Sequence, residues 1–542
     1  MAKQTTKKKQ NNFEEHLWDT ANKLRGNVSS SEYKHVVLSL IFLKFASDKF
    51  EYRRQELIDE GQSDYLDMVE FYTMKNVFYL PELSRWSYIK EHSKQDDLAI
   101  KIDSALSALE KNNKALAGAL PDNYFSRLGL STSKLAALID TISNIDTTSN
   151  NEEDIIGRVY EYFLGKFAAN EGQKGGEYYT PKCVVNLIAE MIEPYEGKIY
   201  DPCCGSGGMF VQSIKFIESH QGNKKNISIY GQESIATTRK LAKMNLAIRG
   251  ISGNLGNVAA DTFFKDQHKD LKADYIMANP PFNLKQWRAE NELVDDPRWA
   301  GYPVPPTGNA NYAWILHMLS KLSENGIAGF VLANGSMSTA TKGEGDIRQK
   351  MIENDLVDCM IALPGQLFYT TQIPVCLWFI TKNKKADFNR GYRDRQRETL
   401  FIDARKMGTM LDRTLKELTK EDIAKIAETY HSWRSQENAE CLMLNDELKN
   451  SETRNSKSQI NNSSMYADIP GYCYSATLEE IKKHNFVLTP GRYVGAEEIE
   501  DDGIPFETKM SELSKTLYEQ MRTSQKLDNV IRKNLETLGF GE

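Results

Sequence analysis

The stretch Asp274-Tyr275-Ile276-Met277-Ala278-Asn279-Pro280-Pro281-Phe282 decides the fold of this chain. Residues 274–278 have the length and apolar content of a strand buried in a sheet. The two prolines then end the strand, because proline fixes φ and has no amide hydrogen for a sheet ladder. Peptide oxygens at this turn cannot be absorbed into sheet pairing, so the sequence predicts that they point outward at the strand end.

Short strand-like runs alternate with helical runs on both sides of this turn. Strands are predicted at residues 198–200, 227–230, 274–277 and 327–332, and helices at about 181–192, 208–219, 235–249 and 311–323. Strands that alternate with helices favour a parallel sheet covered on both faces. The predicted fold class is therefore α/β, with a Rossmann-like domain.

The pattern changes twice along the 542 residues, which indicates three regions. Residues 1–165 are predicted to form an N-terminal all-α domain, because Phe13, Leu17, Trp18, Ala21 and Leu24, and then residues 36–50, follow helical spacing. Residues 166–445 carry the α/β pattern. Residues 446–542 are predicted to form a linker, Asn/Ser-rich over 445–475, and a C-terminal helix.

The predicted C-terminal helix is amphipathic over residues 510–538, although Gln520 and Ser524 interrupt its apolar stripe. Two interpretations stay open. The stripe packs back on its own domain, or it docks on a helix of a partner chain. A long terminal helix after a linker has little core of its own to cover, which favours the partner.

A glycine-rich turn, Asp201-Pro202-Cys203-Cys204-Gly205-Ser206-Gly207-Gly208, joins one predicted strand to a helix that begins near Met209. Its glycines allow a tight turn and a close approach of the backbone to a ligand. The N–H groups at a helix start favour anionic groups. The turn lacks GxGxxG spacing, although such a loop alone fits NAD as well. The candidate cofactor-binding residues here are Asp201, Gly205, Ser206, Gly207 and Gly208.

Two acidic residues follow at strand ends. Glu233 ends the next strand, 28 residues after Gly205, where its carboxylate can accept hydrogen bonds from both hydroxyls of a ribose. Asp261 ends a further strand-like segment and can accept a hydrogen bond from an adenine amino group, with Phe263 as a stacking surface. A simple helix cap is an equally good interpretation of Asp261.

A third element, Gly175-Gly176-Glu177-Tyr178-Tyr179-Thr180-Pro181, lies about 20 residues upstream of the glycine turn. Thr180 is a good N-cap, and Pro181 suits the first helical turn. The glycines and tyrosines crowded before that cap indicate a loop that covers a ligand. The predicted cofactor-binding set is completed by Glu177, Tyr178, Tyr179, Thr180, Pro181 and Lys182.

The turn at Asn279 suits methyl transfer to a planar amine nitrogen. The exocyclic amine of a base is a weak nucleophile, because its lone pair is delocalised into the ring. The side-chain oxygen of Asn279 and the backbone oxygen of Pro280 can each accept one amine hydrogen, which turns the lone pair toward a methyl donor. Phe282 can stack on the base, which must first leave the duplex. The predicted catalytic residues are Asn279, Pro280, Pro281 and Phe282.

In this order, the cap, the glycine loop, Glu233, Asp261 and Asn279 resemble the amino-methyltransferase group of DNA methyltransferases. The fuller pattern resembles the modification subunit of type I restriction-modification systems over nearly the whole chain. The matching stretches are residues 175–181, 201–210, 230–233, 279–282, 309–314 and 363–365. Asn279 with Phe282 also looks more like the adenine enzymes than the cytosine-N4 enzymes.

The resemblance implies a Rossmann-like catalytic domain that transfers a methyl group from S-adenosyl-L-methionine to the N6 amino group of adenine in DNA. It also implies partners. A specificity subunit reads the DNA sequence, typically with two modification subunits bound to it, and a restriction subunit joins for cleavage.

Composition sets limits on these expectations. The net charge is −7, whereas a chain that held DNA alone would usually be basic. Either the DNA contact is local, or another chain supplies much of it. The seven scattered cysteines suit a reduced compartment, and no apolar run approaches the ~20 residues needed to cross a bilayer. We therefore expect a cytoplasmic protein without a membrane segment or metal site.

Other interpretations stay open from the residues alone. A stand-alone DNA methyltransferase or a protein-glutamine methyltransferase needs the same turn, although the long helical flanks argue against glutamine. A non-catalytic partner-binding subunit is disfavoured by the intact Asn279 and Glu233, and a dinucleotide oxidoreductase by the prolines. The basic segment 382–405 either touches phosphate or forms a solvated hairpin.

Overall fold

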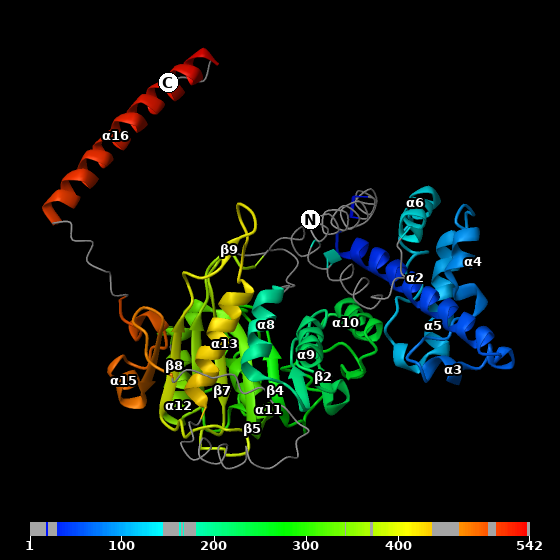
Figure 1. Cartoon of the computed structure of the whole chain (residues 1–542), viewed down its shortest axis with the longest axis horizontal. Helices are drawn as coiled ribbons and strands as arrows, with labels where there is room; N and C mark the ends of the chain where they lie inside the picture. The colour runs from blue at the N-terminus through cyan, green and yellow to red at the C-terminus, as the bar shows by residue number, and fades with distance from the viewer. Residues whose placement is uncertain are drawn as a thin grey trace, which may run out of the picture. The chain divides into compact units, whose positions relative to one another are not determined.

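The computed structural model describes residues 18–19, 30–144, 162–163, 166, 180–341, 343–368, 372–435, 466–496 and 506–538. The chain divides into two compact units, Met1–Gly495 and Ala496–Glu542. Figure 1 shows a sheet flanked by helices and a further set of helices in the first unit. The second unit contains one long helix.

The sheet of the first unit has nine strands in the order β11-β8-β6-β7-β5-β4-β1-β2-β3. Their bounds are β1 (Gly197–Asp201), β2 (Ile227–Gly231), β3 (Gly253–Asn254), β4 (Ala273–Ala278), β5 (Leu322–Ala333), β6 (Val357–Ala362), β7 (Val375–Thr381), β8 (Glu398–Asp403) and β11 (Cys473–Thr477). β7 runs antiparallel to β5 and β6, and β11 runs antiparallel to β8. The remaining neighbours pair in parallel.

The prediction of a Rossmann-like α/β domain is confirmed, with β1, β2, β4 and β5 at the expected strands. The sheet departs from the expected parallel arrangement at β7, which lies between β5 and β6. A dinucleotide-binding Rossmann fold has strand order 3-2-1-4-5-6 with parallel strands. The inserted antiparallel β7 therefore separates this sheet from the oxidoreductase alternative.

Helices cover both faces of the sheet, as predicted. Apolar side chains of α8, α9, α10 and α13 pack on one face, and those of α11, α12 and α15 pack on the other. Their bounds are α8 (Lys182–Ile192), α9 (Gly208–Ser219), α10 (Ala236–Ile248), α11 (Asn311–Lys321), α12 (Glu344–Glu353), α13 (Lys420–Arg434) and α15 (Leu478–Lys483). In Figure 1, α8 and α13 lie in front of the strands.

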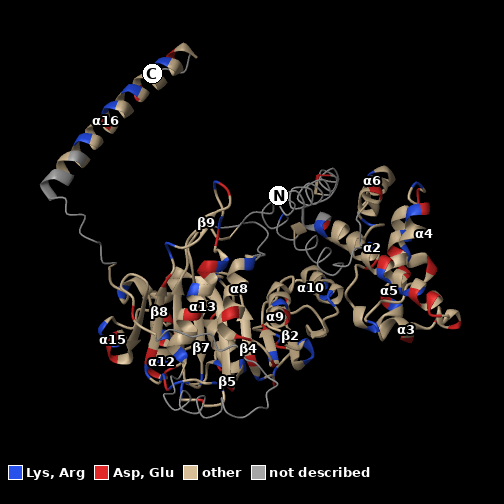
Figure 2. Ribbon diagram, in the orientation of Figure 1, with Lys and Arg blue, Asp and Glu red and all other residues tan. Residues whose placement is uncertain are grey.

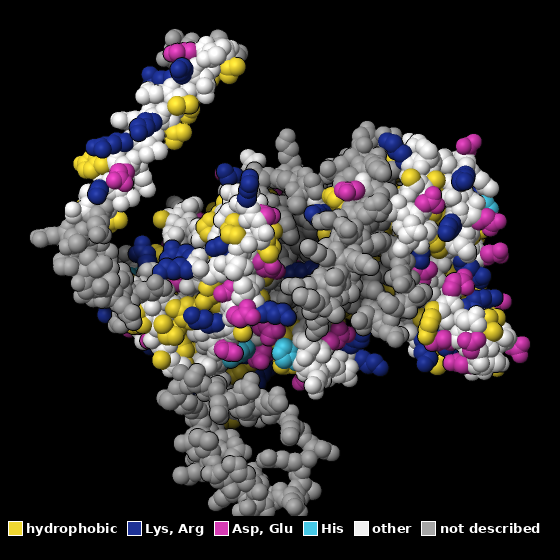
Figure 3. All heavy atoms as spheres, turned by 45° about the horizontal axis from the view of Figure 1, so that its top comes forward, with side chains coloured by type: hydrophobic (Ala, Val, Ile, Leu, Met, Phe, Trp, Pro, Cys, Tyr) yellow, Lys and Arg dark blue, Asp and Glu magenta, His cyan; other side chains and the backbone are white. Residues whose placement is uncertain are grey.

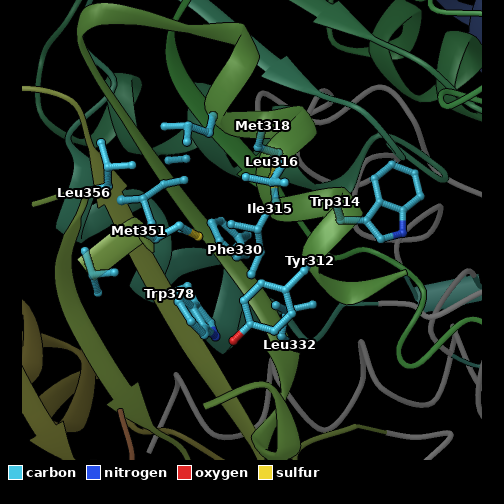
Figure 4. Close-up of a cluster of buried hydrophobic side chains, with 14 of the residues drawn as sticks. Tyr312, Trp314, Ile315, Leu316, Met318, Phe330, Leu332, Met351, Leu356 and Trp378 are labelled. Atoms are coloured by element: carbon cyan, nitrogen blue, oxygen red, sulfur yellow. The ribbon is translucent and has the colours of Figure 1, made fainter. Parts of the chain in front are cut away.

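The core under α11 and α12 is dense in large side chains. Trp378 of β7 stacks on Phe330 of β5, with ring centroids 6.3 Å apart, and Tyr312 meets Trp378 edge-on. Figure 4 shows these rings among the aliphatic side chains of both helices. The Trp378 indole donates to the Ser336 hydroxyl at 3.0 Å, so its polar atom is satisfied inside the core. This packing fixes the strands on which the site is built.

The N-terminal all-α region is also present. Its helices are α2 (Ser30–Asp59), α3 (Val69–Thr73), α4 (Trp86–Glu91), α5 (Leu98–Asn112) and α6 (Thr132–Ser143). The predicted apolar stretch 36–50 lies in α2 and is largely buried, and Trp18 is buried beside Phe163. The other residues cited for the first helix, Phe13, Leu17, Ala21 and Leu24, lie outside the described residues.

The helical region and the sheet domain share part of one core. Leu241, Met244 and Ile248 of α10 belong to the apolar cluster of α2–α6. Lys240 and Lys243 of α10 donate to the carbonyl oxygens of Leu120 and Ala117 at 2.7 and 2.6 Å. The domain boundary at residue 165 stays a prediction, because the residues around it are largely outside the described part.

Part of the region that the sequence predicts to be a linker belongs to the sheet. Residues 466–475 were expected in a linker, but β11 extends the sheet beside β8. The Tyr493 ring stacks on Phe401 of β8 at 3.9 Å, and Leu488 donates its N–H to the Met337 carbonyl oxygen at 2.9 Å. The part of the expected linker that the structure describes is thus sheet edge, because its apolar side chains complete the core under α15.

Only part of the basic segment 382–405 is a solvated hairpin, because residues 387–392 form a mostly exposed antiparallel turn whereas other basic side chains of the segment are buried. Buried Lys384 pairs with Asp355 at 2.8 Å, and buried Arg395 pairs with Asp358 at 3.4 Å. Residues 398–403 of this segment form β8. These cations therefore neutralise carboxylates at the sheet, which the sequence alone did not indicate.

The second unit contains α16 (Phe506–Thr537). Its described leucine side chains are between 43% exposed at Leu535 and 61% exposed at Leu513. Figure 3 shows hydrophobic and basic side chains side by side on this helix, and Figure 2 shows basic residues that recur along it. Among the described residues, no helix is long and apolar enough to cross a membrane, and no His, Cys, Asp and Glu side chains cluster as metal ligands would.

Candidate active site

The candidate site lies at the carboxyl edge of the sheet. β1, β2 and β4 are parallel, so Asp201, Glu233 and Asn279 follow strands that end at the same edge. The chain leaves β1 for α9 on one face and β4 for α11 on the other. Such a reversal of direction opens a crevice, and ligands of open α/β sheets bind there. A cavity at this point is lined by Thr180, Lys182, Val185, Asp201, Cys203, Cys204, Gly205, Ser206, Gly208, Met209, Val211, Gln212, Asn245 and Asn279.

The glycine loop forms one wall of the cavity. Gly205 and Gly207 have φ of 53° and 81°, a region that suits glycine, and α9 begins at Gly208. A Cβ added at Gly205 or Gly208 would meet no atom within 4 Å. Glycine is therefore not required there by packing against the protein. The bare backbone leaves room for a ligand to approach.

Asp201 ends β1 and is buried. Its Oδ1 accepts the N–H of Cys203 at 3.0 Å, which fixes the start of the glycine loop. Burial raises the pKa of Asp201 to about 7, against the lowering effect of this hydrogen bond. The carboxyl group is thus a titratable group on the cavity wall.

Glu233 follows β2 and is 8% exposed. Its Oε2 accepts the N–H of Gly205 at 3.0 Å, and its Oε1 accepts the N–H of Ile235 at 2.8 Å. The carboxylate is therefore held against the glycine loop.

Gln232 is a positioning residue that the sequence analysis missed. Its fully buried side chain donates to the carbonyl oxygens of Ala260 and Lys265 at 3.1 and 2.9 Å. Its Oε1 accepts the N–H of Gln267 at 3.0 Å. One amide thus holds the loop 260–267 beside β2. A polar residue at a buried strand end, directly before a candidate acid, is the signal that could have identified it.

Asp261 lies beside Glu233, because the N–H of Ala260 donates to the Glu233 carbonyl oxygen at 3.0 Å. Asp261 is exposed, and its Oδ1 accepts the N–H of Phe263 at 2.7 Å. The expectation that Phe263 offers a stacking surface is wrong. This ring is buried, with its centroid 4.6 Å from that of Trp287 and 4.3 Å from that of Trp314. The next residue, Phe264, is 49% exposed.

The predicted covering loop is described only at its end. Glu177, Tyr178 and Tyr179 lie outside the described residues. Thr180 and Lys182 line the cavity. Thr180 is not the expected N-cap, because Pro181 occupies that position and no side chain caps α8. The hydroxyl of Thr180 is therefore not used by the helix.

Asn279 directly follows β4, as predicted, and its side chain is the most unusual polar group of the site. Its Oδ1 and Nδ2 are both buried without a hydrogen-bond partner in the structure. Among the described residues, it is the one side chain with two such atoms. A buried polar group without a partner costs about 1–3 kcal/mol. The carboxamide on the cavity wall is thus held ready for a partner that the chain itself does not supply.

The rest of the turn is fixed by packing. Pro280 is buried and Pro281 is half-buried. The Phe282 ring is half-buried and meets Phe368 edge-on, with centroids 5.8 Å apart. One edge of Phe282 is therefore anchored beneath the turn, while part of its surface stays accessible.

A latch of three asparagines joins the turn to α11. Asn311, buried at the start of α11, accepts the N–H of Asn283 at 3.1 Å and donates to the Asn283 Oδ1 at 2.9 Å. Asn309 accepts the N–H of Asn311 at 3.0 Å. Asn283, which has φ of 52°, directly follows Phe282. The latch thus fixes the residue next to the predicted catalytic tetrapeptide, and it gives residues 309–314 a structural role.

Fold and site together define a class of protein. A Rossmann-like sheet with an antiparallel strand between β5 and β6 carries a glycine loop, an acid after β2 and Asn-Pro-Pro-Phe after β4. This combination is that of the S-adenosylmethionine-dependent methyltransferase fold with an amino nitrogen as acceptor.

Comparison with known families is more specific. Residues 151–502 match the N-6 DNA methylase family, and residues 13–142 match the HsdM N-terminal domain. The chain therefore belongs to the N-6 DNA methylase family, among the methylase subunits of type I restriction enzymes.

Individual relatives agree with this assignment. The chain is 47% identical to the HindI methylase subunit of Haemophilus influenzae, over 85% of the chain and all of the relative. It is 39% identical to the MjaIX methylase subunit of Methanocaldococcus jannaschii, over 97% and 92%. The type I methyltransferase subunit of Streptococcus thermophilus has the same fold, with a TM-score of 0.70, 23% identity and coverage of 90% and 99%.

The expectation drawn from the motifs is thus confirmed: the chain is an adenine-specific DNA methyltransferase, the modification subunit of a type I restriction-modification system. The roles of individual residues do not follow from family membership. They depend on the geometry described above.

We expect Asn311→Ala to lower kcat by about 10–100-fold without changing the Kd for S-adenosylmethionine. Removing the latch lets the catalytic turn move, and misplacement of reacting groups costs about this much. Steady-state methyl transfer to DNA and calorimetric titration of the cofactor measure the two quantities.

Asn283→Gly is the matched variant, because glycine keeps the positive φ but loses the side chain. The losses of kcat in the two single variants should not add in the double variant, because both substitutions disrupt the same interaction. Independent, additive losses, or a weaker cofactor Kd, would show that the latch does not position the turn.

Proposed function

We propose that this chain binds S-adenosylmethionine in the cavity at the carboxyl edge and methylates an adenine N6 held by Asn279. The unpartnered carboxamide of Asn279 is the observation that carries the proposal. Its stabilising partner is the amine of the target base. A non-catalytic relative would have no reason to keep two buried polar atoms without partners beside an open cavity.

The cavity and the loops beside it fit the cofactor in three respects. Gly205 and Gly208 leave open space where a side chain would stand. Glu233 is fixed against Gly205, so its carboxylate can accept hydrogen bonds from ribose hydroxyls. Asp261 lies next to it, and its exposed carboxylate can accept from the adenine amino group of the cofactor. Exposed Phe264 replaces Phe263 as the aromatic surface.

We assign the remaining residues of the proposed set to the end of the cofactor that carries its ammonium group. Asp201 faces the cavity, where its carboxylate can attract an ammonium group. Ser206 and Gly207 complete the glycine loop. Thr180 and Lys182 line the opposite side, at the start of α8. We place Glu177, Tyr178, Tyr179 and Pro181 in the same covering loop on sequence grounds.

Bound S-adenosylmethionine supplies an electrophilic methyl group on a sulfonium sulfur. Asn279 Oδ1 and the Pro280 carbonyl oxygen each accept one hydrogen of the adenine amine, which turns the nitrogen lone pair toward the cavity. Pro280 and Pro281 keep these two oxygens in place. Phe282, anchored on Phe368, stacks on the extruded base. A neutral carboxamide suffices, because a methylated amine becomes acidic and loses its proton readily.

We expect Asn279→Ala to bind S-adenosylmethionine normally but to transfer methyl groups at least ~10²-fold more slowly. The reason is that the oxygen of Asn279 acts on the acceptor amine rather than on the cofactor. The measurement is transfer of label from the cofactor to genomic DNA, with and without copurified partners, followed by nucleoside analysis.

Label in N6-methyladenine is the expected product. Exposed Asn112→Ala, in the helical region, is the control variant and should behave as the wild type. Label in protein glutamine alone, or an Asn279→Ala variant with full activity, would contradict the proposal.

We expect cofactor binding to weaken as pH falls below about 7, the pKa to which burial raises Asp201. Below this pH the carboxyl group is neutral and must release a proton before it attracts the cofactor ammonium. The Kd should therefore rise by about tenfold between pH 7.5 and pH 6. Calorimetric titration at several pH values measures this dependence.

Asp201→Asn should bind more weakly at pH 7.5 and lose most of the pH dependence, since its side chain does not titrate. Exposed Asp140→Asn, on α6, is the control that should keep it. A wild-type Kd that is the same at pH 6 and pH 7.5 would exclude Asp201 as the group that meets the ammonium.

A chain with a net charge of −7 needs a second chain to supply phosphate contacts when it binds DNA. We propose that a specificity subunit binds DNA and reads its sequence, with two copies of this chain per specificity subunit, and that a restriction subunit joins for cleavage. A solved structure with the same fold, from a study of complex assembly in a type I restriction-modification system, supports such a complex. We also place the protein in the cytoplasm, since its six described cysteines are free thiols, as suits a reducing compartment.

We further propose that α16 is the docking element for the specificity subunit. Leu513, Leu517 and Ile531 lie on one stripe and are 54–61% exposed. An exposed apolar stripe of this length is stabilised by packing on a partner helix.

We expect Leu517→Glu with Ile531→Glu to abolish copurification of the specificity subunit, because both charges would be buried in the helix contact. Pull-down of the coexpressed subunits measures this. Glu519→Ala is the control, since two residues turn by about 200° on a helix and place Glu519 away from the stripe. Unchanged copurification of the double variant would assign the docking to another surface.

A further inference from the structure

A small hairpin projects from the catalytic edge of the sheet. Its strands are β9 (Thr409–Met410) and β10 (Lys416–Glu417), and residues 409–414 are all exposed. Figure 1 shows it as a loop that stands beyond the ends of the strands, near the start of α8. None of the roles assigned above uses this hairpin.

The hairpin is held rigidly at its base. Gly408 donates its N–H to Asp422 Oδ2 at 3.1 Å, and Lys416 donates its N–H to the Gln366 carbonyl oxygen at 2.8 Å. Leu415 and Leu418 are buried. Gly408 has φ of 86°, and a Cβ there would lie 3.0 Å from the Glu417 carbonyl oxygen. The direction in which the hairpin projects is therefore fixed by the sheet domain.

The tip is also preorganised. Asp412 Oδ1 accepts the N–H groups of Thr414 and Leu415 at 2.7 and 2.8 Å. These hydrogen bonds lower the pKa of Asp412, so its charge is used inside the turn. Leu411 donates its N–H to the Leu415 carbonyl oxygen at 2.9 Å. These hydrogen bonds fix the backbone of the tip, so the positions from which its side chains project are defined before binding.

The base of the hairpin contacts two segments that flank the active site, residues 366–368 and the start of α8. Gln366 lies two residues before Phe368, the ring that anchors Phe282. On the other side, the Cys183 thiol hydrogen-bonds the Leu418 backbone, and Cys183 follows Lys182 in the first turn of α8. The hairpin thus rises beside the place where Asn279 meets its base.

The side chains of the hairpin combine positive charge with exposed apolar surface. Residues 405–417 contain four basic and two acidic residues, on a chain with net charge −7. Arg413 is exposed at the tip, next to Leu411, which is 57% exposed, and Met410, which is 48% exposed. Figure 2 shows basic residues on the loop at β9. Cations suit phosphate, and projecting apolar side chains suit the space between base steps.

We infer that this hairpin is a DNA-contacting element that flanks the extruded adenine. Arg413 contacts a phosphate of the duplex, and Leu411 and Met410 lie against the base step that the adenine leaves. The inference rests on the proposed function and deepens it. It supplies a local DNA contact on an otherwise acidic chain.

Two variants of the assembled methyltransferase separate these roles. Arg413→Gln should weaken binding to cognate and non-cognate duplexes alike and lower the salt slope of log Kd by about one. Met410→Ser with Leu411→Ser should keep duplex binding within about threefold but reduce base extrusion at least fivefold. Fluorescence of 2-aminopurine at the target position, with S-adenosylmethionine present, reports extrusion.

The controls come from a turn at the opposite edge of the sheet. Residues 387–392 form a turn beside Asn325, and Phe388 there is 75% exposed. Phe388→Ser and the nearby exposed Lys385→Gln repeat the same chemical changes and should leave binding and extrusion unchanged. Cofactor Kd should be normal in every variant.

Each outcome decides one point. A wild-type assembly that methylates adenine, with hairpin variants that match the controls, overturns the hairpin inference alone. Variants that release the specificity subunit would make the hairpin a protein contact and would also overturn it. A wild-type assembly that does not methylate DNA adenine refutes the proposed function itself.

Discussion

The site depends on one constraint: the Asn279 carboxamide is kept inside the protein without an internal hydrogen-bond partner. A partner within the chain would stabilise the fold but would also occupy the oxygen that we propose accepts a hydrogen of the target amine. The unsatisfied group costs about 1–3 kcal/mol. The surrounding sheet and the apolar cores on both of its faces offset that cost, so the site can afford a preorganised acceptor.

The same edge is tied together by short hydrogen bonds between neighbouring loops. Glu233 holds Gly205, Gln232 holds the loop 260–267, and Asn311 holds the residue after Phe282. Each bond joins segments that are far apart in the chain. The proposed cofactor-binding loops and the turn at Asn279 are thereby fixed on one rigid sheet. Catalysis by orientation of the reacting groups requires such rigidity.

Many basic side chains of the chain pair with its own carboxylates. Much of the basic segment 382–405 neutralises Asp355, Asp358 and Glu398 rather than facing DNA. The positive charge of the hairpin 405–417 is local, and α16 offers an apolar stripe. This arrangement suits a chain that works in a type I restriction-modification complex, as its family membership indicates.

The sequence by itself determined the alternation of strands and helices and indicated the candidate site motifs, which are the proposed catalytic tetrapeptide, the glycine loop and the acid at Glu233, because proline, glycine and periodicity act over a few residues. It did not reveal β7 between β5 and β6, the burial of Phe263, or the strand β11 in an expected linker. Nor did it reveal that the side chains of Gln232 and Asn311 hold neighbouring loops in place. These features arise from contacts between distant segments. Only the tertiary structure decided which polar groups are satisfied, and it left Asn279 as the described side chain with two buried polar atoms that lack a partner.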